Sequence, residues 1–166
     1  LDQIARFTAL HPARSKKTAS QAALPQQKLD HIGIAVRSIA AARTFYAALG
    51  LAITHEETVE HEQVKTAMLP LGDTRIELLE PTTEDSVIGR FLARRGEGLH
   101  HIALRIAGID ALFDRLRAEG VRLASDRIRT GAGGHRYFFV HPASAGGVLV
   151  EIVSASTNSP AEEVPE

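Results

Sequence analysis

The sequence predicts an α+β protein built from two tandem βαβββ modules, and three observations lead to this fold class. Shifting the chain by 70 residues aligns Leu29–Leu51 with Leu99–Val121 without a gap, so the same unit occurs twice. Each copy opens with apolar residues at every second position, as in a strand, and continues with apolar residues at helical spacing. Each copy then ends in three short apolar segments separated by turns.

The first element of each copy is a predicted strand that carries a histidine near its start. Side chains alternate between the two faces of a strand. Alternation therefore predicts that His31 and Ile32 lie on opposite faces, and that His101 lies on the face opposite to His100.

The second element of each copy is a predicted helix. Ser38 is a suitable N-cap for the first helix, and Gly50 can end it in the left-handed conformation. The repeat of this helix runs from Ile109 to Gly120, and residues 85–95 read as a helix that links the two copies.

The remaining elements are short strands. They are predicted at Leu51–Thr54, Val64–Leu69 and Thr74–Leu79 in the first copy, and at Val121–Leu123, Arg136–Val140 and Val148–Val153 in the second. The expected domain spans residues 29–153, with module one at about 29–81 and module two at about 99–153. We expect residues 1–28 to form an extension that is either partly flexible or packed on a partner, rather than a targeting peptide, because they lack a long apolar stretch. We expect residues 154–166 to form a tail.

Composition excludes several classes of protein. Hydrophobic residues make up 44% of the 166 residues and charged residues 23%, which is typical of a globular protein and not of a disordered or membrane protein. The net charge is −1 and only 5% of residues are aromatic, so a nucleic-acid partner is not expected. With no cysteine, any metal site must use imidazole and carboxylate ligands, and we expect a cytoplasmic location.

Four polar residues occupy matching places in the two copies. The strand histidines are His31 and His101, and a glutamate interrupts a later apolar strand at Glu77 and Glu151. A carboxylate buried without a partner costs several kcal/mol, so Glu151, in the segment VLVEIV, requires a cation or a hydrogen-bond donor. A single histidine or glutamate of this kind is usually structural, but the repetition favours one shared metal site.

The repeat and its four polar positions resemble the vicinal oxygen chelate superfamily, and within it the methylmalonyl-CoA epimerase family. The likeness rests on LDHIGIAV at 29–36, GDTRIELLEP at 72–81, DSVIGRFLARRGEGLHHIALRI at 85–106 and GAGGHRYFFVHPASAGGVLVEI at 131–152. It implies two βαβββ modules that form an incomplete barrel around one divalent metal ion. The family's ligands fall on His31, Glu77, His101 and Glu151.

The resemblance also implies an activity. An enzyme of this family interconverts (R)- and (S)-methylmalonyl-CoA by α-proton transfer through a metal-stabilised enolate, and it is expected to be a homodimer. The metal would be cobalt, or else manganese, nickel, magnesium or zinc. Glu151 matches one proton-transfer base. Some members carry the second base at the position of Thr66, which lacks a carboxylate, so Glu62 is our candidate for it.

Other functions share these features. Lactoylglutathione lyase (glyoxalase I) resembles this chain at all four ligands, whereas an extradiol dioxygenase uses two histidines and one carboxylate, which leaves Glu77 without a role. A non-catalytic small-molecule-binding protein of the same fold is a further alternative, although it would not need all four polar positions.

Overall fold

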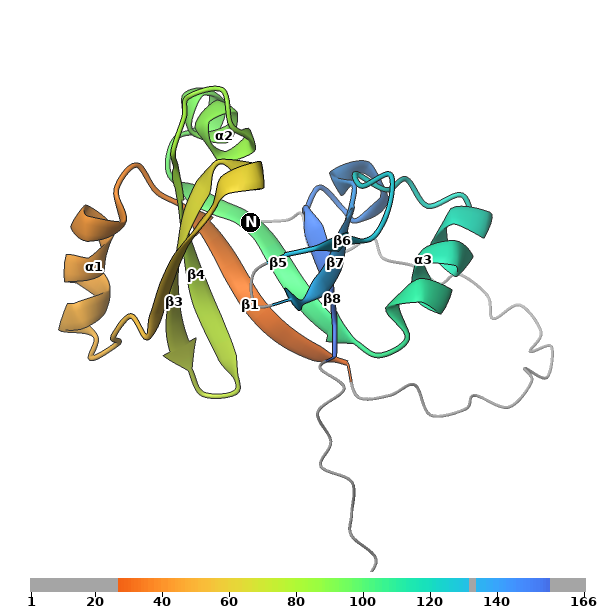
Figure 1. Cartoon of the computed structure of the whole chain (residues 1–166), viewed down its shortest axis with the longest axis horizontal. Helices are drawn as coiled ribbons and strands as arrows, with labels where there is room; N and C mark the ends of the chain where they lie inside the picture. The colour runs from red at the N-terminus through yellow and green to blue at the C-terminus, as the bar shows by residue number, and fades with distance from the viewer. Residues whose placement is uncertain (1–26, 132–133, 156–166) are drawn as a thin grey trace, which may run out of the picture.

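The structure is a computed structural model that describes residues 27–131 and 134–155. Most of the predicted N-terminal extension and most of the predicted C-terminal tail lie outside these ranges. An eight-stranded sheet curls into a half-barrel, with α1 and α3 on its two outer flanks and α2 at one end (Figure 1). The first module consists of β1 (Lys28–Ala35), α1 (Ile39–Ala48), β2 (His55–Val59), the 3₁₀ helix η1 (Glu60–Glu62), β3 (Val64–Leu71) and β4 (Thr74–Pro81). After α2 (Val87–Arg95), the second module consists of β5 (Gly98–Ile106), α3 (Ile109–Ala118), β6 (Arg129–Thr130), β7 (Arg136–Val140), the 3₁₀ helix η3 (Pro142–Ser144) and β8 (Val150–Ser154).

The sheet has the internal symmetry that the sequence repeat predicts. Its strand order is β2-β3-β4-β1-β5-β8-β7-β6, so the two modules meet at the central β1–β5 pair. From this pair outward, the equivalent strands of the two modules follow in the same order. The β1–β5 pair is antiparallel, and β1–β4 and β5–β8 are parallel. The α+β fold of two βαβββ modules in an incomplete barrel is therefore confirmed.

The predicted helix ends are also confirmed. The side chain of Ser38 accepts a hydrogen bond from the backbone N–H of Ala41 at 3.3 Å, as an N-cap does. Gly50 and Gly120 follow α1 and α3 with φ angles of +79° and +76°, which a side chain would strain. Ser86 caps α2 through a hydrogen bond from the backbone N–H of Gly89 at 3.0 Å.

Two predicted strands are wrong. Residues 51–54 are an extended connection, and the strand β2 begins only at His55. Residues 121–123 form only an isolated bridge from Leu123 to Val140. In both segments the apolar side chains pack under α1 or α3 in the core, and this burial produces an apolar pattern without strand pairing.

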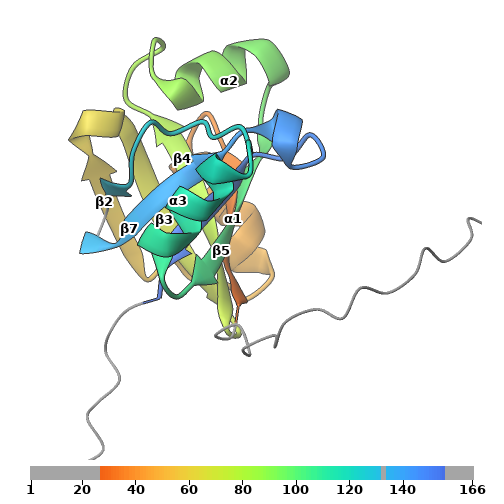
Figure 2. The same cartoon turned by 90° about the vertical axis from the view of Figure 1, so that its right-hand side faces the viewer.

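Two of the three hydrophobic clusters lie on the convex side of the sheet, beneath α1 and α3. Leu69 and Leu78 are fully buried under α1, and Phe138 is fully buried against Phe113 of α3. Figure 2 shows α3 lying across β5 and β7 on this side. The third cluster packs α2 against one end of the concave side through Ala35, Val64, Leu79, Ile88 and Leu92, and polar residues lie beside it on that side. None of the helices in the described ranges has the length and apolar character required to span a lipid bilayer.

Candidate metal centre

Two β-bulges shape the concave face at the central strand pair. The β1–β5 register passes from Leu29 paired with Leu104 to His31 paired with Ala103, so Asp30 is an extra residue in β1. Farther along, Gly33 pairs with His101 and Ile34 pairs with Leu99, so His100 is an extra residue in β5. A bulge interrupts side-chain alternation and redirects the residues around it. Each bulge lies directly before one of the two predicted histidine ligands.

The sheet register brings the four predicted ligands together in two matching pairs. Gly33 of β1 pairs with both Glu77 of β4 and His101 of β5, so these two side chains flank a residue that has none. In the same way, Ala103 of β5 pairs with both His31 of β1 and Glu151 of β8. The small residues leave room on the concave face for all four polar side chains to converge.

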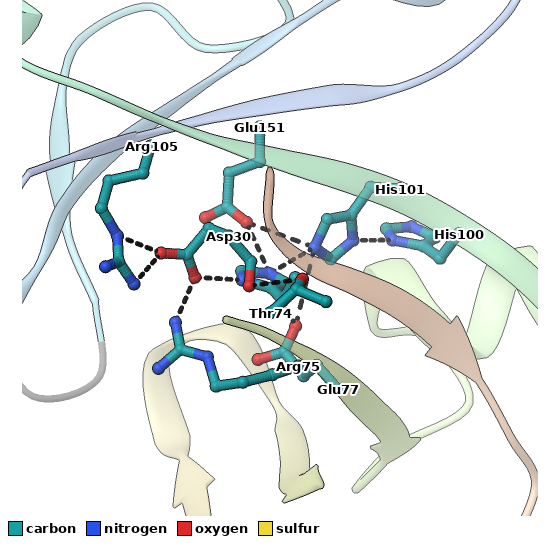
Figure 3. Close-up of polar contacts among 9 residues, drawn as sticks. Asp30, Thr74, Arg75, Glu77, His100, His101, Arg105 and Glu151 are labelled. Atoms are coloured by element: carbon teal, nitrogen blue, oxygen red, sulfur yellow. Dashed lines mark hydrogen bonds and ion pairs between the residues drawn. The ribbon is translucent and has the colours of Figure 1, made fainter. Parts of the chain in front are cut away.

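The donor atoms of the four side chains lie close together (Figure 3). The Nε2 atoms of His31 and His101 are 3.0 Å apart. Glu151 Oε2 lies 3.1 Å from His31 Nε2 and 3.2 Å from His101 Nε2. Glu77 Oε2 lies 3.3 and 3.6 Å from the same two nitrogen atoms. The tightest group of three is His31, His101 and Glu151. Glu77 and Glu151 approach His101 from different sides (Figure 3).

These spacings suit a divalent metal ion. Imidazole and carboxylate ligands bind such ions at about 2.0–2.2 Å, which places neighbouring donor atoms about 3 to 3.5 Å apart. The donor atoms of His31, His101 and Glu151 are spaced accordingly, and Glu77 Oε2 is slightly farther from the two nitrogen atoms. All four side chains are at least 88% buried, with side-chain exposures of 4–12%. The donor set of two imidazoles and two carboxylates matches oxygen- and nitrogen-binding metals.

The charges of the cluster also favour a cation. Burial lowers the pKa of His31, but hydrogen bonds with Asp30, Glu151 and Glu77 outweigh burial and raise this pKa to about 11. Burial raises the pKa of Glu151, but contacts with His101 and His31 lower it to about 2. The carboxylates therefore strongly stabilise positive charge at the point where the two Nε2 atoms meet.

Asp30 is a functional candidate that the sequence analysis missed. Its carboxylate lies 2.9 Å from His31 Nδ1 and also contacts the guanidinium groups of Arg75 and Arg105 (Figure 3). Burial raises the pKa of Asp30, but His31 and the two arginines more than offset burial and hold this pKa well below its usual range. The signal in the sequence was a charged residue in a strand, directly before a predicted histidine ligand, but only the bulge turns it toward the site.

The prediction that His100 lies on the face opposite to His101 is wrong. His100 Nδ1 lies 2.9 Å from His101 Nδ1, and its ring packs edge-on against Phe91. The β-bulge at this residue breaks the strict alternation on which the prediction rested. Burial and the neighbouring His101 lower the pKa of His100 to about 4, which leaves its imidazole neutral at physiological pH.

Glu62, the predicted second base, lies at the end of η1. Its carboxylate accepts a hydrogen bond from the hydroxyl of Tyr137, which is buried on β7. Burial and Glu62 raise the pKa of Tyr137, so the hydroxyl keeps its proton. Phe139, two residues along β7, pairs with Glu151, and Tyr137 therefore belongs to the same face as Glu151.

Thr66 is buried on the concave face, where it pairs with Leu79 of β4 and with Glu57 of β2. Among the described residues, the hydroxyl oxygen of Thr66 and Oε1 of Glu57 are buried without a hydrogen-bond partner. Glu57 is a second carboxylate near this position that sequence reasoning did not select. His141 precedes η3, and its ring nitrogen accepts a hydrogen bond from the backbone N–H of Ala143 at 3.0 Å.

A cleft of about 480 Å³ lies at the α2 end of the sheet, and His100 forms part of its wall. Its polar lining comes from Arg94 and Arg95 of α2 together with His100, and its apolar lining includes Leu99 and Leu149. The contact between His100 and His101 connects the wall of this cleft with the cluster.

The chain matches the model of the Glyoxalase/Bleomycin resistance protein/Dioxygenase superfamily over residues 30–139. It is 35% identical to the mitochondrial methylmalonyl-CoA epimerase of Homo sapiens over 130 residues, which cover 77% of this chain and 74% of that protein.

Two solved structures show the same relationship. The crystal structure of methylmalonyl-CoA epimerase from Mycobacterium tuberculosis is 36% identical, with a TM-score of 0.74, and the match covers 86% of this chain and 94% of that one. A variant of Streptomyces coelicolor methylmalonyl-CoA epimerase in complex with 2-nitronate-propionyl-CoA is 42% identical. Its TM-score is 0.71, and the match covers 77% of this chain and 96% of that one.

Proposed function

The chain belongs to the glyoxalase/bleomycin resistance protein/dioxygenase superfamily, also called vicinal oxygen chelate, and within it to the methylmalonyl-CoA epimerase family of enzymes; from this membership we propose that it interconverts (R)- and (S)-methylmalonyl-CoA. The observation that carries the proposal is the convergence of His31, Glu77, His101 and Glu151 at one point of the concave face. Among the alternatives, the matched relatives favour the epimerase over lactoylglutathione lyase and over a binding protein without catalysis.

We propose that these four side chains hold one divalent metal ion, with cobalt as the first candidate. A bound divalent cation supplies Lewis acidity, which lowers the energy of an enolate next to a thioester. The protein's part is to fix the four donors rigidly. Two donors come from each module, and the ligand-bearing strands β1, β4, β5 and β8 are neighbours in one sheet.

Epimerisation requires removal of the α-proton from one face of the substrate and return of a proton to the other. We propose Glu151 as one proton-transfer group. Its low pKa keeps it ionised at neutral pH, and its side chain remains 12% exposed toward the concave face. A positioned base of this kind contributes about 10²–10⁴-fold to rate.

Glu62 is our proposal for the second proton-transfer group. Thr66 cannot transfer this proton as a carboxylate would, and Glu62 reaches the concave face through its contact with Tyr137. The Tyr137 hydroxyl orients the Glu62 carboxylate. Glu62 belongs to the first module and Glu151 to the second, which suits a reaction that needs one group on each side of a planar enolate.

We further propose that the cleft beside His100 receives the phosphate-bearing arm of the acyl-CoA. Arg94 and Arg95 supply positive charge to this cleft, and Leu99 and Leu149 supply apolar surface. A coenzyme A thioester combines a flexible chain of apolar and amide groups with anionic phosphates. The arginines match the phosphates, and the leucines match the apolar part of the chain.

The test is NMR in deuterium oxide, which follows exchange of the α-proton of methylmalonyl-CoA in the metal-loaded protein. We expect exchange with wild-type protein, and a loss of activity much larger than the loss of metal in Glu151→Gln, because Gln keeps an oxygen ligand but is not a base. Methylglyoxal with glutathione is the competing substrate. Turnover of that pair, without exchange of the acyl-CoA α-proton, would replace the epimerase proposal by lactoylglutathione lyase.

A homodimer and a cytoplasmic location stay predictions of the sequence analysis. Light scattering on the purified protein tests the first, and fractionation of cells tests the second.

A further inference from the structure

The two bulged residues on the central strands are related by the sequence repeat. Asp30 and His100 are separated by the repeat offset of 70 residues, and each directly precedes a histidine of the cluster. Each places a side-chain atom at 2.9 Å from the Nδ1 atom of the histidine that follows it. A β-bulge thus places a hydrogen-bonding group next to the Nδ1 atom of each of His31 and His101.

The position of these groups fixes the chemistry of the two imidazoles. His31 and His101 direct Nε2 toward the cluster, and a neutral imidazole can bind a metal through Nε2 only when its proton is on Nδ1. That Nδ1–H then needs an acceptor, because a buried donor without one is costly. Asp30 Oδ1 and His100 Nδ1 are at hydrogen-bond distance to serve as the two acceptors.

We propose that Asp30 and His100 are paired positioning residues, which hold His31 and His101 as Nδ1–H tautomers with both Nε2 atoms directed at the metal. This inference rests on the metal site of the proposed function, but it does not depend on the identity of the substrate. The two residues contact the ligands and not the reacting atoms.

The two positioning residues differ in strength. Asp30 is 2% exposed and is held by Arg75 of β4 and Arg105 of β5, so its carboxylate has one fixed orientation and a negative charge. A charged acceptor makes a stronger hydrogen bond than a neutral one and increases the basicity of the imidazole. His100 offers a neutral nitrogen and is held mainly by its edge contact with Phe91. Loss of Asp30 is therefore the more severe change.

The experiment measures the affinity for cobalt(II) by competition with a chelator, and the visible absorption of the bound cobalt. We expect Asp30→Asn to weaken cobalt binding by about 10–100-fold and to alter the absorption bands. His100→Ala should weaken binding by about 10-fold, whereas His100→Gln, whose side-chain oxygen can accept the same hydrogen bond, should restore most of the affinity. Asp110→Asn is the matched control, because this exposed carboxylate also pairs with an arginine, Arg136, at 2.6 Å.

A purely structural role for Asp30 gives a different result. If Asp30 serves only to neutralise Arg75 and Arg105, Asp30→Asn lowers the melting temperature but binds cobalt with wild-type affinity well below that temperature. Wild-type affinity and absorption in both Asp30→Asn and His100→Ala would overturn the proposal.

A measurement on the wild-type protein covers the case in which Asp30→Asn does not fold. Long-range ¹H–¹⁵N NMR of the zinc-loaded protein should show a proton on Nδ1 of both His31 and His101. Coordination through Nδ1 of either ring would overturn the proposal. A protein that binds cobalt as expected but does not exchange the acyl-CoA α-proton would contradict the proposed function and leave this inference standing.

Discussion

Gly33 lies directly against the imidazole of His101. A Cβ atom added at residue 33 would lie 2.2 Å from Cε1 and 2.8 Å from Nε2 of that ring, well inside any normal contact. The backbone of Gly33 does not have a positive φ angle, so the need for glycine comes from the neighbouring imidazole and not from chain conformation.

Gly33→Ala should therefore displace His101 and weaken metal binding by more than 10-fold, while the convex-side core stays folded. The His101 ring cannot simply move aside, because it packs edge-on against His100 and Phe139. Circular dichroism checks the fold and chelator competition measures the affinity. Unchanged affinity in a folded Gly33→Ala variant would show that His101 is not a ligand.

The cluster should bind one divalent metal per chain, since each module supplies one histidine and one glutamate to a single point. We expect His31→Ala and His101→Ala each to strip the metal, and metal analysis of the purified variants measures this loss. His61→Ala, a change to an exposed histidine of η1, is the control. Full stoichiometry in both ligand variants would mean that the site is elsewhere.

Metal affinity should rise with pH across the neutral range. The pKa of His31 is raised to about 11, so its proton stays bound through neutral pH and competes with the metal for the ring. One displaced proton gives about a tenfold gain in apparent affinity for each unit of pH below that value. Calorimetry in two buffers of different ionisation enthalpy counts the released proton, and equal binding enthalpies in both buffers would contradict the prediction.

Glu62→Gln should slow exchange of the α-proton more for one epimer than for the other, because each proton-transfer group serves one face of the enolate. Tyr137→Phe should have a smaller effect in the same direction, since the Tyr137 hydroxyl orients the Glu62 carboxylate. Glu60→Gln in the same 3₁₀ helix is the matched control. If Glu62→Gln exchanges both epimers at wild-type rates, another group, such as Glu57, delivers the second proton.

Arg94→Ala and Arg95→Ala should raise KM for the acyl-CoA several-fold with little change in kcat, because we propose that the cleft lined by these arginines binds a part of the substrate remote from the reacting carbon. Arg43→Ala, an exposed arginine of α1 that pairs with Glu56, is the control. The assignment of the cleft fails if steady-state kinetics give an unchanged KM in the double variant.

The sequence by itself determined the modular fold and the four converging side chains. A sequence repeat at an offset of 70 residues predicts that equivalent strands occupy equivalent places in the two modules. The matched pairs His31/His101 and Glu77/Glu151 follow from this repeat. The helix ends could also be predicted from the sequence, because Ser38, Gly50 and Gly120 act through local backbone geometry that needs no distant partner.

Only the tertiary structure decided the surroundings of the cluster. The bulges at Asp30 and His100 arise from pairing between β1 and β5, so no alternation rule applied to one strand can reveal them. The contact of Glu62 with Tyr137 joins residues that are 75 positions apart and belong to different modules. The apolar segments at 51–54 and 121–123 bury their side chains under helices and do not pair as strands of the sheet. Local hydrophobic patterns indicate which residues must be buried. The residues that they contact depend on how the two modules pack together.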